Sequence, residues 1–193
     1  MAQSAHTPLS HDRHSTSAQD GWSTRRIAVT ALLCALSFVL TFVEVPIFPP
    51  APWLKYDPSG IVGLVAALAF GPATGTAAVV LPWLLKTLFV FDPWGHLMAV
   101  VANLALVLPT AALARRMQGA RGLAAGMAVG AVVSLAACVV GNVVVTPVYA
   151  GISTAEVLAM VVPVLLPFNV IKVALNCAGA ALVRKPLAGV LGE

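Results

Sequence analysis

The stretch that decides the fold reads VLAMVVPVLLPFNVIKVALNCAGAALV, residues 157–183. It is long enough to cross a bilayer as a helix, which takes about 20 mostly apolar residues. It nevertheless carries Asn169, Lys172 and Asn176, and their i, i+3, i+7 spacing places them on one helix face. A lysine at membrane depth costs roughly 2.5–3.5 kcal/mol on translocon scales, so such residues usually face a cavity or a partner.

Two interpretations of this polar stripe remain open from the helix alone. In the first, the three side chains face a ligand pocket inside a helix bundle. In the second, Lys172 extends to the nearer membrane interface and the asparagines hold neighbouring helices together.

The composition places the rest of the chain in the membrane as well. Of its 193 residues, 60% are hydrophobic and 9% charged, whereas soluble domains carry about 25% charged residues. The length accommodates five or six spans and leaves no room for a soluble catalytic domain. Cys34, Cys138 and Cys177 all fall in apolar segments, so we expect small buried side chains there and no metal site. The net charge of +4 does not indicate nucleic acid as a partner.

We therefore predict an all-α integral membrane fold, a six-transmembrane-helix bundle. The expected helices cover about 24–43, 59–70 (a short one), 73–91, 94–114, 123–145 and 155–183, with Pro163 and Pro167 bending or breaking the last. Residues 1–23 are polar and aperiodic, which predicts a disordered cytoplasmic tail. Residues 24–186 form the membrane domain, and residues 187–193 are expected to be a cytoplasmic C-terminal tail.

The basic residues predict the orientation. With six helices and both termini inside (N-in, C-in), seven basic residues flank the cytoplasmic ends of the helices and only Lys55 lies in an outer loop. The seven are Arg25, Arg26, Arg115, Arg116, Arg121, Arg184 and Lys185. Trp53, Trp94 and Tyr149 then fall near the outer interface, where aromatic rings anchor helices.

The loop after the first helix reads EVPIFPPAPWLKYDP, residues 44–58. Four prolines between Pro46 and Pro52 stiffen it into an extended path, so we expect a structured outer loop. Its Trp, Lys, Tyr and Asp side chains suit a lid over a pocket. They suit equally well an interfacial spacer with aromatic anchors.

Several expected helices contribute one polar group each. Glu44, Asn103 and Asn142 lie toward the outer half, which suits a single small-molecule site. Lys86 ranks lower, because it can also lie toward the cytoplasm. Motifs for ATP hydrolysis and for metalloprotease or serine-hydrolase chemistry are lacking, so we expect neither catalytic nor metal-binding residues and no enzyme.

Five stretches carry a resemblance to a known family. They are the ridge Ala31-x-x-x-Ala35, FVEVPIFP (42–49), LKYDPS (54–59), AFGPATG (69–75) and PFNVIK (167–172). In this order they resemble the riboflavin-specific S component of energy-coupling factor (ECF) vitamin transporters, from about Thr24 to Val183. The segments Pro82-Trp83 and Phe91–His96 depart from the family pattern.

The resemblance implies a substrate-binding subunit in a prokaryotic cell membrane. Such a subunit captures riboflavin, as transported ligand and not cofactor, and works with a membrane T subunit and two ABC-type ATPases. It implies docking on the T subunit by Ala31 and Ala35. It also implies ligand binding by Glu44, Leu54, Lys55, Tyr56, Asp57, Asn142, Asn169 and Lys172.

The hydrogen-bonding groups of a flavin agree with these residues. An Asn can accept a hydrogen bond from the flavin N3–H, and a Lys can donate one to the flavin C2=O. Two other functions remain open: an S component for another vitamin, and a stand-alone secondary carrier or channel.

The predicted orientation is testable directly. A reporter enzyme fused after Glu193 should be active only on the cytoplasmic side, because the arginine-flanked ends of the helices stay inside. The same reporter inserted after Gly151 should report the outer side. An extracellular signal from the Glu193 fusion contradicts the N-in, C-in topology.

Overall fold

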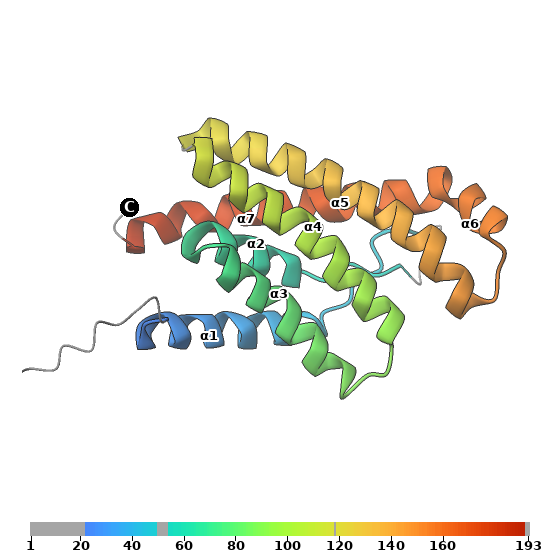
Figure 1. Cartoon of the computed structure of the whole chain (residues 1–193), viewed down its shortest axis with the longest axis horizontal. Helices are drawn as coiled ribbons and strands as arrows, with labels where there is room; N and C mark the ends of the chain where they lie inside the picture. The colour runs from blue at the N-terminus through green and yellow to red at the C-terminus, as the bar shows by residue number, and fades with distance from the viewer. Residues whose placement is uncertain (1–21, 50–53, 118, 192–193) are drawn as a thin grey trace, which may run out of the picture.

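The computed structural model describes residues 22–49, 54–117 and 119–191, with side chains through Arg184. Most of the predicted N-terminal tail, and Trp53, lie outside the described residues. The helices are α1 (Thr24–Leu40), α2 (Ser59–Phe70), α3 (Pro72–Thr87), α4 (Pro93–Met117), α5 (Gly119–Ala150), α6 (Thr154–Met160) and α7 (Leu166–Leu191). They form an elongated bundle in which α1 and the α4–α5 pair lie at opposite sides (Figure 1).

The all-helical prediction is confirmed in the described part of the chain, where the one β pairing is an isolated bridge between Val45 and Tyr56. Three segments are long and apolar enough to cross a membrane: Pro93–Met117, Gly119–Ala150 and Thr154–Arg184. The helix α2 has the predicted bounds, and its 12 residues form a short apolar helix.

Several predicted helix ends were wrong, and α5 (Gly119–Ala150) extends past the predicted range 123–145 at both ends. The first helix ends at Leu40 and not at Val43, and the third at Thr87 and not at Phe91. At the end of α1, the Thr41 hydroxyl donates to the Phe38 carbonyl oxygen (2.7 Å) and closes the last turn. Apolar residues continue past both Leu40 and Thr87, so hydrophobicity alone does not mark where the backbone leaves the helix.

The last span is interrupted as its prolines predict. A π-helical turn, Val161–Leu165, separates α6 from α7 and contains Pro163. Proline has no N–H to donate and crowds the preceding turn, so the regular hydrogen-bond ladder cannot pass through it. The helix α7 then continues to Leu191, through most of the segment predicted as a tail.

The short helix α2 is the centre of the bundle. Eight of its 12 residues are buried, among them Leu64, Val65 and Ala67. These side chains pack against the core residues of α3, α4 and α7, which are Val79, Leu106, Val107, Ala111, Val173 and Ala180. A helix that is apolar all round belongs in an interior, and α2 fits that rule.

The pair α4–α5 packs closely because α5 carries a stripe of small buried residues. They recur every four positions, at Gly122, Gly126, Gly130, Ser134 and Cys138. A Cβ added at Gly126 would lie 2.6 Å from the Thr110 carbonyl oxygen. Small residues let two helix backbones approach in this way. The same face continues to Cys138 and Asn142, which line the cavity described below.

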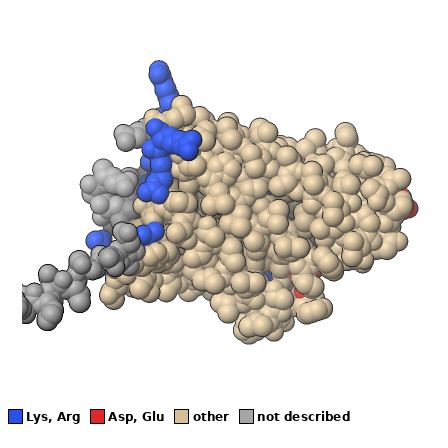
Figure 2. All heavy atoms as spheres, viewed as in Figure 1, with Lys and Arg blue, Asp and Glu red and all other residues tan. Residues whose placement is uncertain are grey.

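The described arginines all lie toward one end of the molecule (Figure 2). They come from the start of α1, the end of α4, the start of α5 and the C-terminal part of α7: Arg25, Arg26, Arg115, Arg116, Arg121 and Arg184. The described acidic residues, Glu44, Asp57, Asp92 and Glu156, lie away from this end, in loops or near the opposite helix ends.

The contact between α2 and α3 predicts a sharp effect of one substitution. A Cβ added at Gly75 would overlap the Ala67 side chain and lie 2.8 Å from the Ala67 Cα atom. Gly75→Val should therefore force the helices apart and destabilise the protein by about 1–3 kcal/mol, the usual cost of overpacking. Thermal unfolding in detergent measures this, with the exposed Ala73→Val as control. Equal unfolding midpoints for the two variants would contradict the packing.

Candidate ligand-binding site

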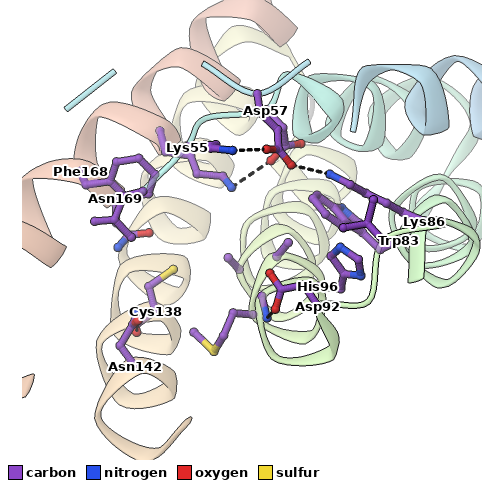
Figure 3. A pocket seen from close by; sticks show the side chains of 18 of the residues that line it. Lys55, Asp57, Trp83, Lys86, Asp92, His96, Cys138, Asn142, Phe168 and Asn169 are labelled. Atoms are coloured by element: carbon purple, nitrogen blue, oxygen red, sulfur yellow. Dashed lines mark hydrogen bonds and ion pairs between the residues drawn. The ribbon is translucent and has the colours of Figure 1, made fainter. Parts of the chain in front are cut away.

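A cavity of about 410 Å³ lies between α3, α4, α5, α7 and the loop before α2. That volume is in the range of sites for small-molecule ligands. The charged and amide side chains of its wall converge from different elements (Figure 3). The wall contains Glu44, Leu54, Lys55, Asp57, Trp83, Lys86, Val90, Asp92, Gly95, His96, Met98, Ala99, Ala102, Cys138, Asn142, Tyr149, Phe168, Asn169 and Lys172.

The structure brings together seven of the eight residues predicted to bind a ligand. Residues far apart in the sequence meet at this wall: Glu44, Leu54, Lys55, Asp57, Asn142, Asn169 and Lys172. Tyr56, the eighth, is not part of the wall. That these residues bind a ligand stays a prediction.

Lys172 has a carboxylate partner across the cavity. Its Nζ atom lies 3.1 Å from Asp57 Oδ2, and the two side chains are 12% and 5% exposed. Asp57 Oδ1 accepts hydrogen bonds from the Ser59 backbone N–H (3.2 Å) and the Ser59 hydroxyl. Asp57 therefore joins the start of α2 to α7. Neither interpretation of the polar stripe named Asp57 as a partner of Lys172.

Glu44 accepts hydrogen bonds from two lysines, one exposed to solvent and one buried. Its carboxylate lies 2.8 Å from Lys55 Nζ and 2.7 Å from Lys86 Nζ, and the lysines are 49% and 2% exposed. Partial burial acts to raise the pKa of Glu44, but the hydrogen bonds from Lys55 and Lys86 outweigh it, and the net pKa is lowered. Glu44 therefore stays ionised.

The two asparagines of the wall are held in place by their own helices. Asn142 Nδ2 donates to the Cys138 carbonyl oxygen and Asn169 Nδ2 to the Leu165 carbonyl oxygen, both at 2.7 Å. Asn142 Oδ1 accepts from the Thr146 hydroxyl (3.2 Å). Asn169 Oδ1 accepts no hydrogen bond from the described residues, so it remains an acceptor for a molecule in the cavity.

The third residue of the polar stripe, Asn176, lies in the core instead. Its Oδ1 atom accepts from the buried Tyr56 hydroxyl (3.1 Å). Burial and, secondarily, the neighbouring Asp57 raise the pKa of Tyr56 to about 12, so the hydroxyl stays a donor. Asn176 and Asn103 flank Gly60, where an added Cβ would lie 2.5 and 2.6 Å from their amide atoms. Asn103, also considered for the site, thus belongs to this packing contact.

The predicted ligand residues left out six charged or aromatic residues of the wall, Tyr149 and Phe168 among them. Lys86 was ranked low, and Trp83, Asp92 and His96 were not proposed. The Trp83 and His96 rings lie 5.2 Å apart, and the Thr87 hydroxyl lies 2.8 Å from His96 Nδ1. The available signal was that Pro82-Trp83 and Phe91–His96 are the segments that depart from the family pattern.

The charges of the wall balance. Three lysines (Lys55, Lys86, Lys172) face three carboxylates (Glu44, Asp57, Asp92), and 3 − 3 leaves no net charge apart from His96. Aromatic side chains, namely Trp83, Tyr149 and Phe168, supply apolar surface beside them. A half-open cavity of this size, in a bundle with three segments of membrane-spanning length, indicates a membrane protein with room for a small molecule.

Comparison with known proteins gives the family. The model of the family described as "ECF transporter, substrate-specific component" matches residues 25–183. The chain therefore belongs to the substrate-specific components of ECF transporters, which are multi-pass proteins of the prokaryotic plasma membrane and not enzymes.

Named relatives and a solved structure agree. The chain is 29% identical over 160 residues to the riboflavin transporter FmnP of Bacillus subtilis, covering 77% of this chain and 84% of that one. It is 29% identical over 155 residues to the riboflavin transporter RibU of Staphylococcus aureus, covering 77% and 82%. It also superposes on a solved S component of a bacterial ECF transporter with a TM-score of 0.77 and 27% identity, over 88% of this chain and 98% of that one.

The Tyr56–Asn176 hydrogen bond predicts a loss of stability on its removal. Tyr56→Phe should lower the free energy of unfolding by about 1–3 kcal/mol, because a buried Asn176 acceptor loses its donor. Chemical unfolding in detergent measures the change. Tyr149→Phe, at a 55% exposed site, is the matched control and should have little effect. Equal losses for both variants would mean that the hydrogen bond contributes nothing.

Proposed function

We propose that this chain captures riboflavin from the outer side of the membrane for ATP-driven uptake by partner subunits. The observation that carries the proposal is the Asn169 Oδ1 atom, which accepts no hydrogen bond from the described residues and lies beside Lys172 in a cavity whose charged side chains balance and whose wall includes aromatic rings. The names of the relatives at 29% identity support the choice of riboflavin among vitamins.

The flavin ring offers groups that match this wall. Asn169 Oδ1 accepts from N3–H of the imide edge, and the second N–H of an asparagine amide donates to a neighbouring carbonyl. Lys172 donates to C2=O, at the cost of loosening its contact with Asp57. Trp83 and Phe168 pack against the apolar faces of the ring. Glu44, Lys55 and Asp57 meet the hydroxyls of the ribityl chain, with Leu54 beside them and Asn142 on the opposite wall.

We further propose six spans with both termini in the cytoplasm. The arginines at one end of the bundle support this orientation, because basic residues remain inside. The helix α2, which spans about 18 Å at 1.5 Å per residue, is too short to cross the hydrocarbon core alone. It crosses as the buried partner of α3.

The partners in this proposal are a membrane T subunit and two ABC-type ATPases. Ala31 and Ala35, the predicted docking residues, both lie exposed on α1. Their neighbours Leu32 (71%) and Leu36 (52%) are exposed as well. A ridge of small residues among exposed apolar ones allows close approach of another membrane helix.

Substitution of Lys172 tests the ligand site. Lys172→Met should weaken riboflavin binding by one to two orders of magnitude, since hydrogen bonds to charged groups are worth about 1.5–3 kcal/mol. Asn169→Ala should weaken it as well, through the loss of the imide acceptor. Titration of the purified protein with riboflavin, followed by quenching of flavin fluorescence, measures the affinity.

Arg184→Met is the matched control, because it removes one cation from the same helix outside the cavity. Unchanged affinity in Lys172→Met and Asn169→Ala, with tight binding by the wild type, would refute the assigned contacts. Tight binding of a different vitamin and none of riboflavin would refute the ligand. Riboflavin uptake in cells that lack the coupling ATPases would identify a stand-alone carrier instead.

A further inference from the structure

Lys86 differs from the other two lysines of the cavity in being almost fully buried and in donating hydrogen bonds to two protein oxygens. Its Nζ atom donates to the Thr41 carbonyl oxygen (2.5 Å) and to Glu44 Oε1 (2.7 Å). The ammonium group also lies 4.9 Å from the centre of the Trp83 ring and 5.3 Å from that of Phe42. Protein oxygens therefore take two of the three N–H donors of the ammonium, and the two rings stabilise its charge.

The partners of Lys86 lie where α1 passes into the loop before α2. Thr41 is the C-cap of α1, and a cation at this end interacts favourably with the last carbonyls of the helix. Glu44 follows three residues later and lies directly before the bridge in which Val45 and Tyr56 exchange two hydrogen bonds of 2.8 Å. A single buried cation of α3 thus fixes the end of α1 and the base of this loop, residues 44–49 and 54–57.

The loop base has a second anchor of different character. There Lys172 meets Asp57 at 3.1 Å and is partly exposed to the cavity, so a ligand can compete for it. Lys86 is 2% exposed and makes the shorter contact. The Lys86–Glu44 contact is therefore suited to persist when a ligand enters. The Lys172–Asp57 contact is suited to open, so that Lys172 can bind the ligand instead.

We propose that Lys86 is a positioning residue for ligand capture: it acts through Glu44, holding that carboxylate and the loop base at the cavity wall. The role in capturing riboflavin rests on the proposed function. The attachment of the loop base to α3 through Lys86 does not depend on it. When Lys86 is removed, Glu44 keeps only the exposed Lys55, and the loop base loses its attachment to α3.

Two measurements on the full-length protein test this role. The first is hydrogen exchange of the ligand-free protein, read in peptides that cover the loop base. Lys86→Met should speed exchange there severalfold, because the Val45–Tyr56 bridge opens more often. The second is the rate of riboflavin dissociation, which should rise on the order of tenfold, because residues within one ion-pair network are coupled by energies that correspond to a factor of this size.

A double-mutant cycle separates positioning from direct contact. Glu44→Gln should have a similar effect on dissociation, and Lys86→Met/Glu44→Gln should be no worse than the more severe single variant. Arg116→Met, which removes one cation at the far end of α4, is the control for net charge and should leave both measurements unchanged.

Each alternative result overturns the role. Wild-type exchange and dissociation in Lys86→Met would show that the loop base does not depend on this lysine. A second contrary result is that Lys86→Met binds riboflavin more slowly or releases it faster while hydrogen exchange of the loop base stays unchanged. If its effect on dissociation also multiplies with that of Glu44→Gln, Lys86 contacts the ligand itself. If Lys86→Met does not fold, Glu44→Gln alone must speed exchange of the loop base. If the wild type binds no riboflavin, the proposed function fails, while hydrogen exchange still decides the anchoring.

Discussion

The structure depends on one constraint, which is that an ammonium group inside a membrane protein needs a partner. Lys86 and Lys172 lie on apolar helices, and each finds a carboxylate on the loop between α1 and α2. Breaking a buried pair by removing one partner leaves an uncompensated charge, which is strongly destabilising. The loop before α2 is therefore attached at both its ends to helices distant in sequence, and the cavity lies between the attachments.

The same pairing supports the proposal that the cavity takes an uncharged ligand. Its lysines already face as many carboxylates, so a molecule that enters does not need to bring charge of its own. What it must offer is hydrogen-bonding groups for Asn169 and Lys172 and a flat apolar surface for the aromatic side chains. A buried polar group left unpaired by a wrong ligand is costly, and this cost is a source of discrimination.

Much of the fold could be predicted from the sequence because its signals are local. The turn at Gly71-Pro72 delimits α2, and Pro163 marks the π turn before α7. The spacing of Asn169 and Lys172 predicted that both lie on one helix face, and in the structure both line the cavity. Lys86, Trp83 and His96 were not assigned, because their direction depends on how α3 and α4 rotate against the bundle. The pocket interpretation included both Tyr56 and Asn176. In the structure their side chains form a hydrogen bond in the core, where Gly60 lets the helices come close together.

If this cavity holds a flavin, the molecule that copurifies with the protein shows it most directly. The protein would be isolated from cells grown with riboflavin, and the released compound identified by its visible absorption and its mass. We expect a yellow protein that carries the mass of riboflavin at about one molecule per chain. A colourless protein that stays colourless after incubation with riboflavin, or the mass of a different vitamin, would contradict the proposal.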